Sequence, residues 1–211
     1  MEKNLTELVF IVDRSGSMGG LEDDTIGGFN AMLKDQQDIE GDAIVTTVLF
    51  DDKYELLHDR INIKGVAPLT KKDYTVRGYT ALLDAIGITI NKIHSVQENT
   101  NSEYRADKVM FVIITDGHEN SSCEYTAEQV KERIKHQKEK YGWEFIFLGA
   151  NMDAVAEAAK YGISPDRASN YYATPAGIIG AWGAISVASS EYRVGSEIKN
   201  LEKEIKESRG Y

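Results

Sequence analysis

Three short motifs place side-chain oxygens where they could bind a ligand. Asp13-x-Ser15-x-Ser17 directly follows an apolar run, Thr80 lies in the segment GYTALLDAI, and Asp116 directly follows a second apolar run. Together they offer two carboxylates and three hydroxyls, with no imidazole or thiol. Because oxygen donors select hard cations, these residues predict a site for Mg²⁺, with Mn²⁺ and Ca²⁺ as competitors.

A cation bound by these residues would keep a position for an outside ligand. Hydroxyls are neutral, and two carboxylates at most cancel the charge of a divalent ion. A carboxylate from another molecule suits the remaining position best. We therefore expect a protein partner that supplies a Glu or Asp side chain.

The scaffold that would bring the motifs together is predicted by the apolar pattern. Short apolar or β-branched runs alternate with segments of helical period, which favours an α/β fold with a mostly parallel sheet and helices on both faces. In such sheets, ligands bind outside the carboxyl ends of the strands. The expected strands are 8–12, 43–50, 54–63 (weak, at an edge), 108–115, 143–148 and 168–173, and the expected helices are 21–37, 81–96, 126–140, 153–161 and one from 178 onward. Gly41, Gly142 and Gly162 are expected to end helices in the left-handed conformation.

The C-terminal segment differs in character from the rest of the chain. Residues 191–211 are neutral overall and carry an apolar stripe with helical spacing, formed by Val194, Ile198, Leu201 and Ile205. We predict a main domain over 1–190 and an amphipathic helix over 191–211. This helix either docks on its own domain or binds a partner.

The three motifs, in order, spacing and strand context, resemble the metal-ion-dependent adhesion site (MIDAS) of the von Willebrand factor type A family. The resemblance covers roughly residues 5–190. It implies a doubly wound, six-stranded sheet with one antiparallel edge strand, for which 54–63 is the candidate. The family's usual role is protein–protein binding rather than catalysis.

The resemblance also implies a role for each site residue. Ser15 and Ser17 would bind Mg²⁺ directly, and Asp13 and Asp116 would act mostly through water. Thr80 would change between direct and water-mediated contact when a partner binds.

Each motif alone also has an ordinary structural explanation. Asp and Ser after a strand often cap the next helix, Thr80 could cap the helix that follows it, and Asp-Gly is a common turn. A magnesium-dependent phosphotransferase with Asp13 as nucleophile is disfavoured, because Ser15 stands where enzymes of the haloacid dehalogenase type have a second Asp. The other alternative is an assembly subunit that binds through the C-terminal helix without metal.

Several nearby residues have two possible roles. The following are candidates for the rim or support of the site, or else for plain turns, caps and core: Met18, Asp51, Asp52, Tyr79, Asp84, His118, Glu119 and Asn120. The remaining histidines, His58, His94 and His136, are isolated in sequence, and Cys123 is expected to be an inert thiol.

The composition excludes some classes of partner. Among 211 residues, 24 are Lys or Arg and 34 are Asp or Glu, so the net charge is −10. This charge disfavours nucleic acids and anionic membranes as partners. The longest purely apolar run, 109–114, is too short to span a membrane. The single cysteine fits a reducing compartment, so a cytoplasmic location is expected, and the oligomeric state stays open.

Overall fold

Apolar runs form the strands of a single sheet, because residues covered on both faces must be apolar on both. The computed structural model describes residues 4–199, 201, 203 and 205. Its strands are β1 (Thr6–Asp13), β2 (Ala43–Phe50), β3 (Tyr54–Asn62), β4 (Lys108–Thr115), β5 (Glu144–Gly149) and β6 (Ala168–Asn170). Its α-helices are α1 (Glu22–Asp38), α2 (Leu82–Asn99), α3 (Ala127–Tyr141), α4 (Ala154–Lys160) and α5 (Pro175–Val194).

The sheet has the order β3-β2-β1-β4-β5-β6. All neighbouring strands are parallel except β2 and β3, which form an antiparallel pair at one edge. The predicted α/β class, the six strands and the antiparallel edge strand are confirmed. The last strand is shorter than predicted, since β6 ends at Asn170 rather than at residue 173.

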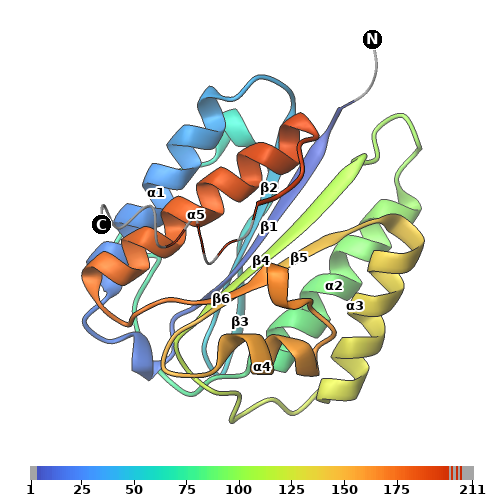
Figure 1. The fold of residues 1–211 in the computed structure, drawn as a ribbon. Coiled ribbons are helices and arrows are strands. Elements are labelled where there is room, and N and C mark those ends of the chain that lie inside the picture. The colour runs from blue at the N-terminus through green and yellow to red at the C-terminus, as the bar shows by residue number, and fades with distance from the viewer. Residues whose placement is uncertain (1–3, 200, 202, 204, 206–211) are drawn as a thin grey trace.

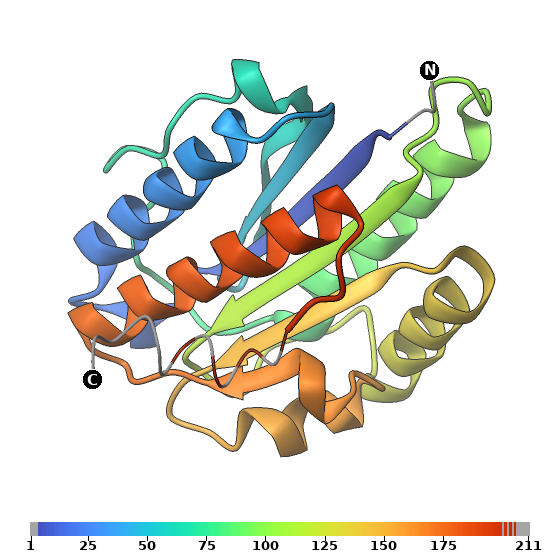
Figure 2. The same ribbon diagram turned by 45° about the horizontal axis from the view of Figure 1, so that its top comes forward.

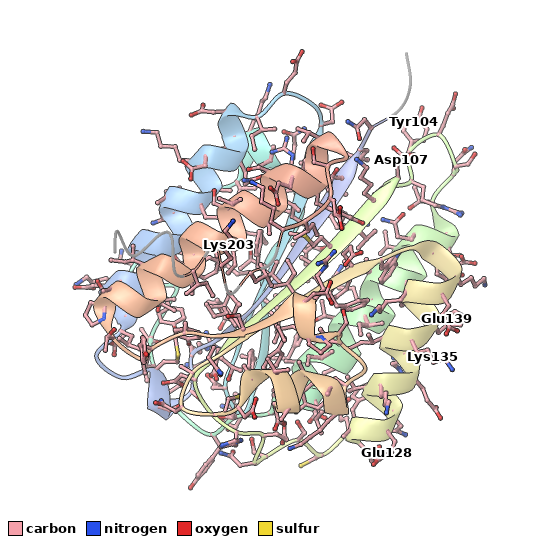
Figure 3. All side chains as sticks on the ribbon, viewed as in Figure 1. Tyr104, Asp107, Glu128, Lys135, Glu139 and Lys203 are labelled. Atoms are coloured by element: carbon pink, nitrogen blue, oxygen red, sulfur yellow. The ribbon has the colours of Figure 1, made fainter. Side chains whose placement is uncertain are left out.

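Helices cover both faces of the sheet (Figure 1). One core cluster joins α1 and α5 to one face, and a second joins α2, α3 and α4 to the other. Side chains fill the space between these layers, while Lys135 and Glu139 point outward from α3 (Figure 3). Figure 2 shows the arrow of β4 ending at the edge of the sheet where α5 begins. None of the helices described is long and apolar enough to cross a membrane.

Glycine ends α3 and α4 as the pattern predicts, but α1 ends at Asp38 with an extended Ile39 as its cap, so the prediction for Gly41 is wrong. Gly142 has φ 66° at the end of α3, and Gly162, with φ 78°, follows the last turn of α4. Gly41, two residues beyond the residue that caps α1, has φ 101°. Only glycine adopts such angles without strain, so each one turns the chain toward the next strand.

The C-terminal segment departs from the predicted continuous helix over 191–211. α5 continues to Val194, and Gly195, with φ 79°, ends it. Ile198, Leu201 and Ile205 are then buried in the core cluster on the α1 and α5 side, whereas Val194 is 62% exposed. The prediction missed the glycine terminator inside the stripe. Residues 200, 202, 204 and 206–211 lie outside the described part of the chain, and the domain division at residue 190 stays a prediction.

Candidate metal site

Three loops meet at the carboxyl end of the sheet. The serine loop (residues 14–21) joins β1 to α1, the threonine loop (residues 76–81) precedes α2, and the aspartate loop (residues 116–126) joins β4 to α3. β1 and β4 are adjacent and in register, so Asp13 and Asp116 emerge side by side from the same edge. Both carboxylates are buried, at 0% and 2% exposure.

The hydroxyls of Ser15, Ser17 and Thr80 surround one point beside Gly117. A β-carbon added to Gly117 would lie 2.9 Å from Ser17 Oγ, 3.0 Å from Thr80 Oγ1 and 3.7 Å from Ser15 Oγ. Ser15 Oγ and Ser17 Oγ lie 3.1 Å apart and share a hydrogen bond. Ser15 and Thr80 are buried, while Ser17 is exposed. The structure thus brings the predicted hydroxyls to a common space that opens to solvent at Ser17.

Asp13 is held by two hydrogen bonds. Its Oδ1 accepts one from Ser15 N at 2.7 Å, and its Oδ2 accepts one from Thr115 Oγ1 at 2.5 Å. Burial raises the pKa of Asp13 to about 6, against the opposing effect of these hydrogen bonds. Sequence reasoning missed Thr115, which closes the apolar run of β4. The signal was available in the strand register, because pairing of β1 with β4 places this hydroxyl beside Asp13.

Asp116 has one oxygen in a hydrogen bond and one without a partner. Ser17 Oγ donates to its Oδ1 at 2.5 Å. Its Oδ2 is buried, and no group in the described part of the chain donates to it. Burial raises the pKa of this carboxyl as well. A buried polar atom without a partner costs free energy unless a ligand or water satisfies it.

A hard divalent cation fits this set of donors. The set offers the three converging hydroxyls, the unpartnered Asp116 oxygen and the Asp13 carboxylate, all of them oxygens. Within the described residues, no group of three or more His, Cys, Asp or Glu side chains is arranged to hold a metal. The candidate site has only two carboxylates and takes its other donors from hydroxyls, so it does not belong to such a group. That these five residues bind a metal stays a prediction.

The aspartate loop is fastened to the threonine loop and the start of α2. Thr80 N donates to Asn120 Oδ1 at 2.9 Å, and Asn120 N donates to Thr80 O at 3.1 Å. Glu119 accepts from Leu83 N at 3.0 Å, and Asp84 accepts from three consecutive amides of the aspartate loop. Glu119, Asn120 and Asp84 therefore brace the site, which for Asp84 is one of its two predicted roles. His118 is exposed on the same loop.

The remaining candidates for the rim or support of the site lie in different surroundings. Asp51 forms the predicted turn, because its side chain accepts a hydrogen bond from Lys53 N at 2.8 Å. The same carboxylate also pairs with two arginines. Met18 is fully buried in the core, whereas Tyr79 is 69% exposed beside Thr80. The two therefore do not form one apolar ring around the site.

Two of the histidines that are isolated in sequence meet in space. His94 and His136 lie with ring centroids 6.0 Å apart, and both contact Tyr141. They are remote in sequence, and the packing of α2 against α3 brings them together. His58 packs in the core near Phe29 and shares a hydrogen bond with a threonine of β2.

Comparison with known proteins gives structural matches only. No protein-family model matches the chain, and no curated protein sequence does. Proximal thread matrix protein 1 from the mussel byssus, with a zinc-occupied MIDAS motif, matches 89% of this chain at 12% identity, with a TM-score of 0.58. A von Willebrand factor type A protein from Catenulispora acidiphila matches 89% of the chain at 14% identity, with a TM-score of 0.56. Manganese-loaded TRAP protein from Plasmodium vivax matches 80% of the chain at 14% identity, with a TM-score of 0.52.

These solved structures are longer than this chain. The matches cover 46% of the mussel protein, 43% of the Catenulispora protein and 68% of the Plasmodium protein. The shared part is the sheet with its two layers of helices. The chain therefore has the fold of a von Willebrand factor type A domain.

Proposed function

We propose that this chain is a protein-interaction module that binds Mg²⁺ at the carboxyl edge of its sheet and captures an acidic side chain of a partner. Ser15 and Ser17 would bind the cation directly, and Asp13 and Asp116 would act mostly through water. Thr80 would change between direct and water-mediated contact when the partner binds. When bound, the cation supplies a position for an outside oxygen ligand. The observation that carries the proposal is the convergence of three hydroxyls beside an unpartnered, buried Asp116 oxygen.

The chemistry of the site favours binding over catalysis. Both oxygens of Asp13 accept hydrogen bonds, from Thr115 and the Ser15 amide, so this carboxylate is not placed as a free nucleophile. The five proposed ligands include no imidazole and no thiol. We therefore propose a binding role and no enzymatic one.

Two structural matches support a divalent cation in this fold. The mussel byssus protein has zinc in its MIDAS motif, and the Plasmodium protein is loaded with manganese. For the present chain, Mg²⁺ is proposed first, with Mn²⁺ and Ca²⁺ as competitors, because every donor is an oxygen. A cytoplasmic location is proposed from the single cysteine, Cys123.

The alternative of a metal-independent assembly surface at the C-terminal stripe has less support. Ile198, Leu201 and Ile205 are buried against the chain's own core, so they are not available to a partner in this conformation.

The proposal is tested by Mn²⁺ binding, followed by electron paramagnetic resonance, with Mg²⁺ as competitor. We expect one saturable site that Mg²⁺ displaces and that Asp13→Ala removes. Partner capture should then fail with a chelator and with Ser15→Ala or Asp116→Ala. Capture that continues unchanged in chelator would refute the metal-dependent function.

A further inference from the structure

Asp51, at the end of β2, lies between two arginines from different loops. Its Oδ2 accepts a hydrogen bond from Arg14 Nε at 2.8 Å and another from Arg77 Nε at 2.8 Å. Asp51 and Arg14 are buried, at 0% and 2% exposure, whereas Arg77 is 52% exposed. A second carboxylate, Glu55, pairs with Arg14 Nη1 at 2.6 Å and more distantly with Arg77 Nη2 at 3.9 Å, but it is 44% exposed.

The two arginines belong to the two loops that carry the hydroxyls. Arg14 opens the serine loop, directly between Asp13 and Ser15, and Arg77 lies in the threonine loop, three residues before Thr80. One buried carboxylate oxygen therefore joins both loops.

Backbone contacts connect the same segments. Arg77 N donates to Arg14 O at 2.9 Å, and Gly16 N donates to Gly78 O at 3.2 Å. Gly78 has φ 67°, and a β-carbon there would lie 2.0 Å from an Asp52 oxygen, so only glycine allows this approach. The loops are thus fixed to each other and to the end of β2.

Asp51 is ionised in this arrangement. Burial acts to raise its pKa, but hydrogen bonds from Arg77, the Lys53 amide and Arg14 together hold the pKa below its ordinary value. Removing one partner of a buried ion pair leaves an uncompensated charge, so the surrounding loops must rearrange.

We propose that Asp51 is a positioning residue that, through Arg14 and Arg77, sets the distance between the serine and threonine loops. Its hydrogen bonds and ion pairs within the described residues are to Arg14, Lys53, Arg77 and Ala81 and to none of the five proposed ligands, so it acts through the loops that carry them. Its effect on cation affinity rests on the function proposed above. Its effect on the two loops does not.

The test uses three variants of the full chain. Asp51→Asn removes the charge that both arginines share. Arg77→Gln, at a half-exposed position, breaks only the link to the threonine loop and guards against a folding defect in the first variant. Glu55→Gln is the matched control, because it removes a half-exposed carboxylate from the same two arginines but leaves the buried Asp51 in place.

Amide hydrogen exchange without metal is the first measurement. Peptides over 14–20 and 76–82 should exchange faster in Asp51→Asn and Arg77→Gln, while peptides over 109–114 in β4 keep the wild-type rate. Glu55→Gln should resemble the wild type. Faster exchange in only one loop, faster exchange throughout the sheet, or an equal effect of Glu55→Gln would overturn the proposal.

Mn²⁺ affinity is the second measurement. Asp51→Asn and Arg77→Gln should weaken binding on the order of tenfold, as is typical for residues that orient metal ligands. If both variants exchange faster in the two loops but bind Mn²⁺ with wild-type affinity, the claim that Asp51 positions the metal site is overturned. If the wild type binds no Mn²⁺, the proposed function fails, and hydrogen exchange alone still decides whether Asp51 couples the loops.

Discussion

Ser17 donates a hydrogen bond to Asp116 at 2.5 Å, although 99 positions separate the two residues in the sequence. This contact joins the serine loop to the aspartate loop at the opening of the candidate site. Under the proposed function, this hydroxyl would be a cation ligand as well as the donor that orients the carboxylate.

Replacing Ser17 with alanine should therefore abolish Mn²⁺ binding without unfolding the protein. The exposed hydroxyl contributes little to packing, so the thermal midpoint should change by only a few degrees. Ser95→Ala, on the exposed side of α2, is the matched control. If Ser17→Ala with Mn²⁺ gives the same electron paramagnetic resonance spectrum as the wild type, this hydroxyl does not bind the ion.

Gly117→Ala tests the space between the hydroxyls. Its methyl group would lie 2.9 Å from Ser17 Oγ and 3.0 Å from Thr80 Oγ1, so it would occupy the place where the hydroxyls meet. We expect loss of Mn²⁺ binding with the fold retained, as judged by circular dichroism. Gly27→Ala is the control, because a β-carbon there meets nothing within 4 Å. Normal binding by Gly117→Ala would mean that the cation lies elsewhere.

Thr115→Val should weaken Mn²⁺ binding on the order of tenfold, because it removes the donor that orients Asp13. Valine has nearly the same shape, so the core of β4 is preserved. Thr115→Ser keeps the hydroxyl and should restore most of the affinity. If valine and serine behave alike, the hydrogen bond to Asp13 has no part in binding.

The affinity for metal should depend on pH through Asp13. Since its pKa is about 6, protonation below that value removes the negative charge that favours a cation. Below about pH 6 the cation must displace the proton on Asp13. Titrations with Mn²⁺ at a series of pH values should therefore show the affinity falling by roughly tenfold per pH unit in that range. A flat profile down to about pH 5 would contradict the role of Asp13.

Without metal, the same group should act on stability in the opposite sense. Its folded pKa lies above the ordinary value of 3.8, so its stabilising contribution is present at low pH and is lost as the pH rises from about 4 to about 6. Asp13→Asn should therefore raise the free energy of unfolding above pH 6 by about 2 to 3 kcal/mol, and this gain should vanish near pH 4. Urea unfolding at both pH values measures it.

Leu201→Ala should destabilise the fold by about 2 to 4 kcal/mol, because this side chain is 1% exposed in the core cluster. Val194→Ala, at a 62% exposed position, should change stability by about 0.5 kcal/mol or less. Chemical denaturation compares the two. Equal, small effects would mean that the C-terminal segment does not pack on the domain in solution.

Much of the fold was predictable because local sequence and tertiary position agree. The run at 43–50 is rich in β-branched residues and the run at 108–115 is apolar from 109 to 114, and the strands β2 and β4 have the predicted bounds. The end of β6 was not predictable, because Tyr171 is apolar enough for a strand. Its hydroxyl donates to Thr115 O at 3.1 Å, a contact between residues 56 positions apart that the local pattern does not reveal.

The candidate site was predictable where residue type alone decides the chemistry. Asp13, Ser15, Ser17, Thr80 and Asp116 are polar residues at strand or helix ends, and the structure brings them together. The residues that hold these five side chains and their loops in place were harder to predict from the sequence. The bond from Thr115 depends on strand register, and the pairing of Arg14 with Asp51 depends on contacts between residues far apart in the chain.

The two edges of the sheet have a consequence for self-association. β3 has two register shifts against β2, and Arg60, with φ 52°, interrupts its extended backbone. At the other edge, β6 has only three residues. An irregular edge and a very short one offer few regularly spaced N–H and C=O groups to an incoming strand. The two edges thereby disfavour growth of the sheet by addition of strands from other copies of the chain.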